Sequence, residues 1–208
     1  RALHSRGHRV AVWTVDRGDH LGTRVIDGVE VRDLPTPLPA RSAGALVRFG
    51  AALPGALRAW VSAYRSLRPD FLHVQCFGPN GVYALALSRL TNTPLVVSSH
   101  GETFMDDHRV FERSALLRRA LRDAGRRASV TTACSRMVAH DLVGYSGARE
   151  PVVVPNGVEL GEGVEDVPAR APEWWPSHGS VVGAVGRVEE IKGFDLLLRA
   201  FAGIRRPG

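Results

Sequence analysis

The sequence predicts an α/β fold built on a doubly wound parallel sheet, and three observations support this prediction. Short apolar runs, typical of buried strands, recur along the chain. Segments with apolar residues at three- and four-residue steps, the periodicity of amphipathic helices, lie between them. Their alternation indicates βαβ units. A chain of 208 residues that is 44% hydrophobic is long and apolar enough to form a core, which excludes disorder.

The first part of the chain supplies most of these elements. After a short helical end closed by Gly7, we expect strands at 9–14, 28–32, 70–75, 94–99, 129–133 and 151–154. We expect helices at 45–67, 78–90, 111–128 and 135–144. The segment 45–67 is expected as two helices, because Pro54-Gly55 lies in its middle. Residues 1–160 therefore form the first predicted domain.

The chain changes character after that domain. Proline, glycine and acidic residues dominate 161–179, which is typical of a linker. Residues 181–185 then predict a strand, and a helix bearing Leu196, Leu197, Ala200 and Phe201 follows. One strand and one helix cannot enclose a core. We therefore expect 180–208 to be the first βα unit of a truncated second domain.

Composition excludes several function classes. The two cysteines, Cys76 and Cys134, rule out a disulfide scaffold or a cysteine-rich zinc module and fit a reducing, cytoplasmic compartment. The net charge is +6, yet Lys192 is the only lysine and every other basic residue is arginine. We attribute this bias to genome composition and predict no nucleic-acid partner. No apolar stretch is long enough to span a bilayer.

The most specific motif runs from Gly186 to Gly193, between the predicted strand and helix of the second unit. Doubly wound sheets bind ligands at such turns. Backbone amides at the helix N-terminus favour an anion, and Arg187 and Lys192 add positive charge suited to a diphosphate. The alternative is two solvated cations on a surface loop.

Several motifs together resemble the family-4 glycosyltransferases of the two-domain GT-B type. They are the segments 7–12, 100–101, 154–158 and 185–193, with the helix start at Ser135. The resemblance implies paired Rossmann-like domains, with an acceptor site mainly in the first and a nucleotide-sugar site mainly in the second. It also implies that Arg187 and Lys192 contact the donor diphosphate, and that transfer proceeds with retention and without a metal or cofactor.

The resemblance also defines what we expect to be missing. The family's first strand, its glycine-rich loop and the paired glutamates of the second domain have no counterpart in this sequence. We therefore expect a fragment that is inactive by itself. Three alternatives remain: a nucleotide-sugar epimerase, a phosphorylase, or a non-catalytic sugar- or nucleotide-binding module.

His100 follows a predicted central strand and is the candidate catalytic residue. By resemblance it lies near the transferred sugar, whereas a lone histidine at a strand end is more often a structural hydrogen-bonder. Gly101 and Glu102 follow it, and Glu102 is a candidate for contact with acceptor hydroxyls. The nearby Asp106, Asp107 and His108 suggest a metal, but helix capping explains them better, so no metal site is expected.

Further acceptor-side candidates begin helices or turns. Ser135 is expected as an N-cap whose helix amides face the ligand, and Asn156 marks a turn at the domain crossing. Gly78 and Asn80 border the acceptor pocket or simply form a loop before a helix. The acceptor class is left open as carbohydrate, lipid or small molecule.

The helix at 111–128 is rich in arginine. Its arginines are Arg113, Arg118, Arg119, Arg122, Arg126 and Arg127. Opposite an apolar stripe, these side chains suit anionic lipid headgroups, as in peripheral membrane enzymes. A solvated charged face is the alternative.

Overall fold

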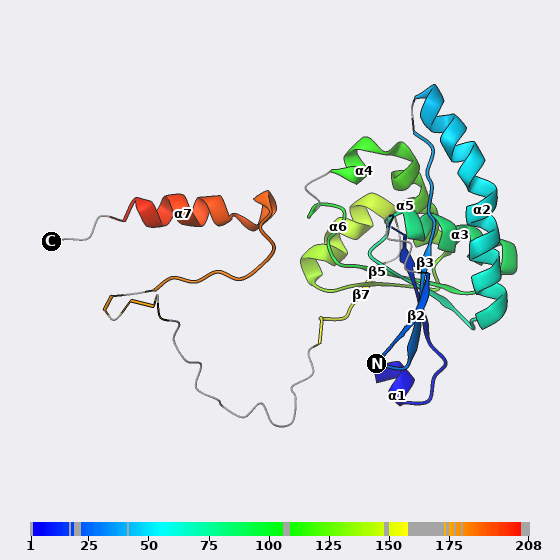
Figure 1. The fold of residues 1–208 in the computed structure, drawn as a ribbon, viewed down its shortest axis with the longest axis horizontal. Helices are drawn as coiled ribbons and strands as arrows, with labels where there is room; N and C mark the ends of the chain where they lie inside the picture. The colour runs from blue at the N-terminus through cyan, green and yellow to red at the C-terminus, as the bar shows by residue number, and fades with distance from the viewer. Residues whose placement is uncertain are drawn as a thin grey trace. The chain divides into compact units, whose positions relative to one another are not determined.

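The computed structural model describes residues 2–16, 18, 22–40, 42–105, 109–147, 150–157, 173, 175–176, 178–179 and 181–204 (Figure 1). The chain divides into two units. One comprises Arg1–Phe104 and Arg109–Pro155, and the other comprises Met105–His108 and Asn156–Gly208.

The first unit opens with a short helix, α1 (Ala2–Ser5), and a three-stranded sheet. Its strands are β1 (Ala11–Val15), β2 (Thr23–Ile26) and β3 (Val29–Leu34), in the order β1-β3-β2. β1 runs parallel to β3, whereas β2 and β3 form an antiparallel hairpin. Asp27 and Gly28 in its turn both have positive φ, 50° and 77°, as a tight hairpin requires. β2 is absent from the prediction, although the Asp-Gly pair signals it.

A four-stranded parallel sheet forms the rest of this unit. Its strands follow chain order: β4 (Leu72–Gln75), β5 (Leu95–Ser99), β6 (Val130–Ala133) and β7 (Val152–Val153). The crossovers between them contain α3 (Pro79–Thr91), α4 (Val110–Arg113), α5 (Ala115–Arg127) and α6 (Arg136–Ser146). The predicted α/β class with a parallel sheet is confirmed. Because the strands are parallel and adjacent, their carboxyl ends lie along one edge.

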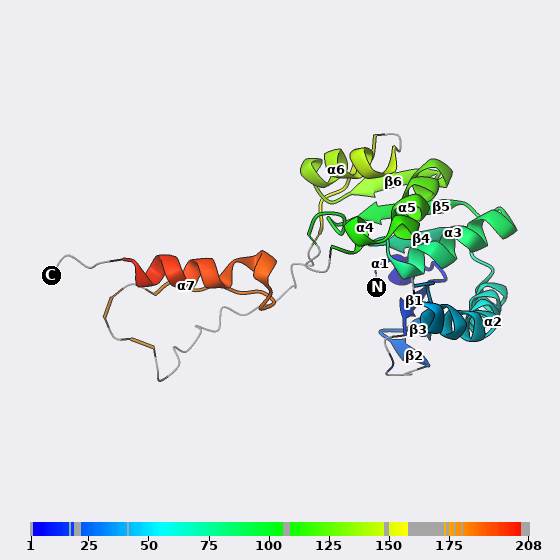
Figure 2. The same cartoon turned by 90° about the horizontal axis from the view of Figure 1, so that it is seen from above.

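The segment predicted as two helices is one helix, α2 (Ala43–Leu67), which lies against the first sheet (Figure 2). The prediction of a break at Pro54 is wrong, because the backbone hydrogen bond that proline removes lies on the solvent-facing side of the helix. Pro54 and Gly50, whose carbonyl cannot receive a bond from the proline nitrogen, are both exposed. The opposite face buries Ala56, Trp60 and Ala63 without interruption, so packing favours a continuous helix.

The helix expected at 111–128 is instead two helices, α4 and α5. Ser114 adopts an extended conformation between them, and its hydroxyl accepts a hydrogen bond from the Leu117 amide at 3.2 Å. This N-cap restarts the helix, which sequence periodicity alone did not indicate. Leu117, Leu121 and Ala124 of the predicted buried stripe are buried, whereas its fourth member, Ala128, is the C-cap of α5 and only partly buried.

Aromatic side chains connect the two sheets. Trp60 of α2 stacks on Tyr83 of α3 at 5.3 Å and meets the Trp13 ring of β1 edge-on at 5.9 Å. The Trp60 indole nitrogen donates to the Pro35 carbonyl oxygen at 2.9 Å, and the Tyr83 hydroxyl donates to that of Pro37 at 2.7 Å. These contacts join β1, α2 and α3 into one core around which both sheets are arranged.

The free edges of β1 and β4 border a cavity of about 780 Å³. Its lining includes Trp13 on the first side and Leu72 and Val74 on the second. The indole nitrogen of Trp13 is buried without a hydrogen-bond partner, the one such side-chain atom within the described residues. β1 and β4 thus belong to separate sheets, with the cavity between their edges. That the family's first strand is missing from this position stays a prediction.

The second unit contains a 3-10 turn, η1 (Glu190–Lys192), and the predicted helix as α7 (Phe194–Ala202). The predicted strand at 181–185 is not formed. Strands need hydrogen-bonded neighbours, whereas Val181, Val182 and Val185 are all exposed. No residue of α7 is buried. Most of the expected linker at 161–179 lies outside the described residues. Among the described helices, none is long and apolar enough to span a membrane.

Candidate functional site

A polar assembly occupies the loops that follow β4 and β5. The strand register pairs Gln75 with Ser98, which brings the segments after both strands side by side. Backbone bonds extend the pairing, since the Cys76 amide donates to the Ser98 carbonyl oxygen at 3.0 Å. The Cys134 amide likewise donates to the Ser99 carbonyl oxygen at 3.2 Å, which adds the loop after β6. The carboxyl edge of the sheet therefore gathers side chains from three loops, where sheets of this class bind ligands.

Glu102 holds two of these loops together. One carboxylate oxygen accepts a hydrogen bond from the Phe77 amide at 2.8 Å. The other accepts from the His100 amide at 2.8 Å and from the Ser99 hydroxyl at 2.9 Å. Both oxygens are thus engaged by the protein itself. The arrangement shows Glu102 supporting the loops, while the predicted contact with acceptor hydroxyls is untested.

His100, the predicted catalytic residue, lies partly exposed in this assembly. Its Nε2 is 2.8 Å from Oε1 of Gln75, and Nε2 of Gln75 is 3.0 Å from Nε2 of His73. His73 Nε2 lies 2.7 Å from the Ser98 hydroxyl. The sequence predicts His100 as a site residue and gives no prediction for Gln75 and His73, which the structure places beside it. The signal was the alternation along β4, which buries Leu72 and Val74 and turns His73 and Gln75 to the other face.

The titration of nearby groups reflects their surroundings. Desolvation of the ring, and then the neighbouring His100 imidazole, lower the pKa of His73, which favours its neutral form. Desolvation, the Glu102 carboxylate and Cys134 raise the pKa of the Cys76 thiol. Cys76 is therefore a protonated thiol at neutral pH and a weak nucleophile, although it stands at the end of β4.

The remaining first-unit candidates begin helices. Ser135 is the N-cap of α6, as predicted, with its hydroxyl accepting from the Val138 amide at 3.3 Å. Gly78 precedes α3 and supplies no side-chain cap, and Pro79 is the first residue of that helix. Asn80 lines the cavity between β1 and β4. Gly101, directly after His100, has a φ of 95°, a conformation that favours glycine in the turn.

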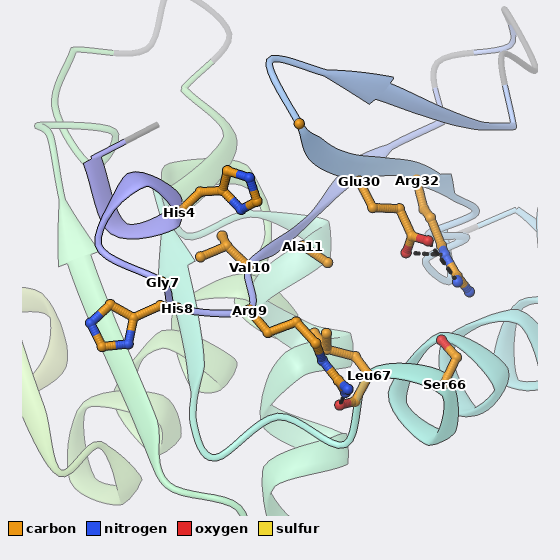
Figure 3. A pocket seen from close by; sticks show the side chains of 11 residues that line it. His4, Gly7, His8, Arg9, Val10, Ala11, Glu30, Arg32, Ser66 and Leu67 are labelled. Atoms are coloured by element: carbon orange, nitrogen blue, oxygen red, sulfur yellow. Dashed lines mark hydrogen bonds and ion pairs between the residues drawn. The ribbon is translucent and has the colours of Figure 1, made fainter.

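A second hollow lies at the opposite end of the first sheet. His4, His8, Arg9, Glu30 and Arg32 line it, at the amino ends of β1 and β3 (Figure 3). Its cations already have partners, since Arg32 binds Glu30 at 2.7 Å and Arg9 donates to the Leu67 carbonyl oxygen. Doubly wound sheets bind ligands at carboxyl ends, so this hollow is a weaker candidate than the His100 assembly.

The donor-side candidates belong to the second unit. Arg187 forms an ion pair with Glu189 at 2.7 Å and remains largely exposed. Lys192 is exposed at the end of η1, directly before Gly193 and α7. Asn156 is exposed and belongs to no helix or strand. Both cations precede α7 in the chain, and their role in binding a donor diphosphate stays a prediction.

Several arginines of the predicted membrane-facing helix have structural partners. Arg118 donates to the Phe111 and Glu112 carbonyl oxygens, each at 2.6 Å. Arg122 donates to the Tyr145 carbonyl oxygen, and Arg127 donates to Ser88 and Asn92. Arg113, Arg119 and Arg126 are exposed. Arg122 is exposed as well, whereas Arg118 and Arg127 are partly buried.

Metal ligands are not gathered within the described part of the chain. No group of three or more histidine, cysteine or acidic side chains there is placed to hold an ion. Asp106, Asp107 and His108, the residues that suggested one, lie outside the described residues.

Comparison with known proteins identifies the family. No curated protein sequence matches the chain. Among solved structures it is similar to a sucrose-phosphate synthase from Thermosynechococcus elongatus, with a TM-score of 0.52 and 15% sequence identity. That match covers 75% of this chain and 80% of the synthase chain, and it supports the fold alone. The model of Glycosyltransferase Family 4 matches residues 1–162. The chain therefore belongs to the family-4 glycosyltransferases and has the GT-B type of fold.

Proposed function

We propose that this protein transfers a sugar from a nucleotide-diphosphate donor to an acceptor, with the His100 assembly at the reacting sugar. The observation that supports this most is the ordered polar edge at the ends of β4 and β5, where Glu102 fixes the loops and Gln75 fixes His100. An imidazole held in this way suits hydrogen bonding to sugar hydroxyls or to developing charge. Membership of the family-4 glycosyltransferases supports this placement, because the resemblance implies an acceptor site mainly in the first domain.

The donor diphosphate would bind Arg187, Lys192 and the N-terminus of α7. Departure of the nucleoside diphosphate builds negative charge on its phosphate oxygens. Arg187 supplies forked hydrogen bonds, Lys192 a compact charge, and the free amides of the first turn of α7 further donors. Since Arg187 pairs with the partly buried Glu189, diphosphate binding would exchange that carboxylate for phosphate oxygens. Fixed positive charge aimed at a leaving group lowers the barrier to its departure.

We further propose that transfer retains the anomeric configuration and uses protein cations in place of a metal. The second part of this proposal is supported by the presence of two exposed cations, Arg187 and Lys192, in the segment that leads into α7. Retention rests on the family resemblance alone. The stereochemistry of the product, read from the anomeric coupling constant by NMR, tests it directly.

The donor site is tested by Arg187→Ala and Lys192→Ala in the intact protein. We expect each change to lower kcat/KM by roughly two to three decades, because contacts to developing charge are lost. Arg199→Ala is the matched control, since Arg199 is an exposed arginine of α7 paired with Asp195 at 3.5 Å. Activity near that of the unsubstituted protein in both donor-site variants would refute the assignment.

The same assay separates transfer from the alternative activities. A labelled donor is incubated with and without acceptors, and the fate of the sugar is followed. Label that moves only when an acceptor is present supports transfer. Epimerised sugar without an acceptor, or release that requires phosphate, would assign the protein to another reaction, and binding without turnover would make it a non-catalytic module.

Peripheral membrane contact and a cytoplasmic location stay proposals. Arg113, Arg119 and Arg126 are exposed cations that would meet anionic headgroups. Cosedimentation with vesicles of phosphatidylglycerol and phosphatidylcholine tests this contact, and binding that survives loss of all three arginines would exclude this surface. Both cysteines are free thiols, in keeping with a reducing compartment.

A further inference from the structure

We infer that Gln75 is a positioning residue for His100, which it holds in the tautomer that carries the proton on Nε2. The inference rests on the geometry of the two side chains, and its kinetic consequence rests on the proposed function. Gln75 ends β4 and His100 directly follows β5, so the register of two neighbouring strands brings them together. Oε1 of Gln75 lies 2.8 Å from Nε2 of His100.

The amide can make this contact in one sense only. A carboxamide oxygen accepts and never donates, so His100 Nε2 must carry the proton. In the neutral ring, Nδ1 is then the acceptor, and within the described part of the chain no hydrogen bond engages it. An acceptor nitrogen of fixed direction is what recognition of a sugar hydroxyl requires.

A second set of contacts agrees with this direction of the Gln75 amide. Its nitrogen lies 3.0 Å from Nε2 and 3.4 Å from Nδ1 of His73, so the donor end of the amide faces that ring. His73 is itself held by the Ser98 hydroxyl at 2.7 Å, and Ser98 Oγ lies 2.6 Å from the Thr132 hydroxyl. Ser98 is buried, which gives the chain of contacts a rigid base in β5 and β6.

The charged and titratable neighbours are compatible with this arrangement. They are His73, Cys76, Glu102 and Cys134. The lowered pKa of His73 keeps its ring neutral, so that it can accept from the Gln75 amide. Glu102 binds the backbone amide of His100 and not its ring. Among the side-chain hydrogen bonds of the described residues, Gln75 is therefore the partner that orients the imidazole.

The direct test is a long-range ¹H–¹⁵N correlation spectrum of the histidine rings in the ¹⁵N-labelled chain. We expect the Nε2-protonated tautomer of His100 in the unsubstituted protein and a mixture of tautomers in Gln75→Leu. The exposed His140 ring is the internal control and should be unchanged. A His100 protonated on Nδ1, or a tautomer unchanged in Gln75→Leu, would overturn the inference whether or not the protein transfers sugar.

Gln75→Glu gives a second readout that keeps the size of the side chain. A carboxylate at Nε2 stabilises the imidazolium, so the pH midpoint of His100 should rise by about one unit or more, as for an adjacent opposite charge. An unchanged midpoint would contradict the contact.

In the active protein, Gln75→Leu should lower kcat by about 10–100-fold with a smaller change in KM, because a misdirected group affects the reacting geometry. Unchanged kcat would remove the catalytic consequence.

Discussion

Glu102 joins the loops after β4 and β5 by accepting three hydrogen bonds, and all three contacts are partly buried. Glu102→Ala leaves the Phe77 and His100 amides and the Ser99 hydroxyl without their acceptor. We expect the free energy of unfolding to fall by about 1–3 kcal/mol, the usual cost of unpaired buried donors. Urea denaturation measures it, and Glu112→Ala, at an exposed glutamate, is the control. Equal stability of the two variants would show that the loops do not depend on Glu102.

His73 makes stability depend on pH. Its pKa is lowered in the folded protein, so between that value and the ordinary 6.5 the unfolded chain binds more protons. The free energy of unfolding should therefore fall as pH falls through this window and stay level above it. Comparing urea unfolding at several pH values for the unsubstituted chain and His73→Gln isolates the effect. A difference between the two proteins that does not vary with pH would contradict it.

At this scale the sequence predicts residues whose role is local. Ser135 as an N-cap and His100 at a strand end follow from neighbours in the chain, and both lie where expected. The partnership of His100 with Gln75 joins positions 25 apart and exists only through the pairing of β4 with β5. Glu102 is similar, because its role is decided by the Phe77 amide from another loop. Such contacts depend on how neighbouring strands pair, and the sequence pattern does not predict that register.

Two glycines in different helices have opposite expected effects. Gly55 of α2 is exposed, and an added Cβ would meet nothing within 4 Å. Gly55→Ala should therefore stabilise the protein by about 0.5–1 kcal/mol through helix propensity. Gly81 of α3 is buried, and a Cβ there would lie 2.6 Å from the Phe77 ring.

Gly81→Ala should destabilise by about 1–3 kcal/mol, because the ring has to move in a filled core. Thermal unfolding of the two variants measures both effects in the same assay. Stabilisation by both substitutions would mean that Phe77 is loosely packed, and destabilisation by Gly55→Ala would mean that α2 is not continuous through Pro54.

Elements were predictable where periodicity and end signals agree. All four strands of the second sheet and helices α3 and α6 lie within a few residues of expectation. The errors occur where one local signal was given too much weight or overlooked. Pro54 does not end α2, Ser114 divides α4 from α5, and the Asp27-Gly28 turn creates β2. In each case, packing or capping decides between conformations that the pattern leaves open.

At the scale of the whole molecule, the two units differ in how much of the apolar surface of their helices and strands they bury. The first unit has a core that includes Trp60, Leu95 and Leu121. In the second, α7 exposes Leu196, Leu198 and Phe201, and the predicted strand at 181–185 finds no neighbour. The sequence predicted this contrast from the number of elements. Whether 180–208 begins a second Rossmann-like domain stays a prediction.

The most direct test of the account is kcat/KM for transfer of labelled sugar by the intact protein with His100→Ala, compared with His140→Ala. Both residues are histidines of the first unit, but only His100 belongs to the His100 assembly at the ends of β4 and β5, whereas His140 lies in α6. We predict a loss of about 10²–10³-fold for His100→Ala, in the range expected of a group that acts on the reacting sugar, and no loss for the control. Transfer within twofold of the unsubstituted protein in folded His100→Ala would contradict the claim that sugar transfer takes place at this edge.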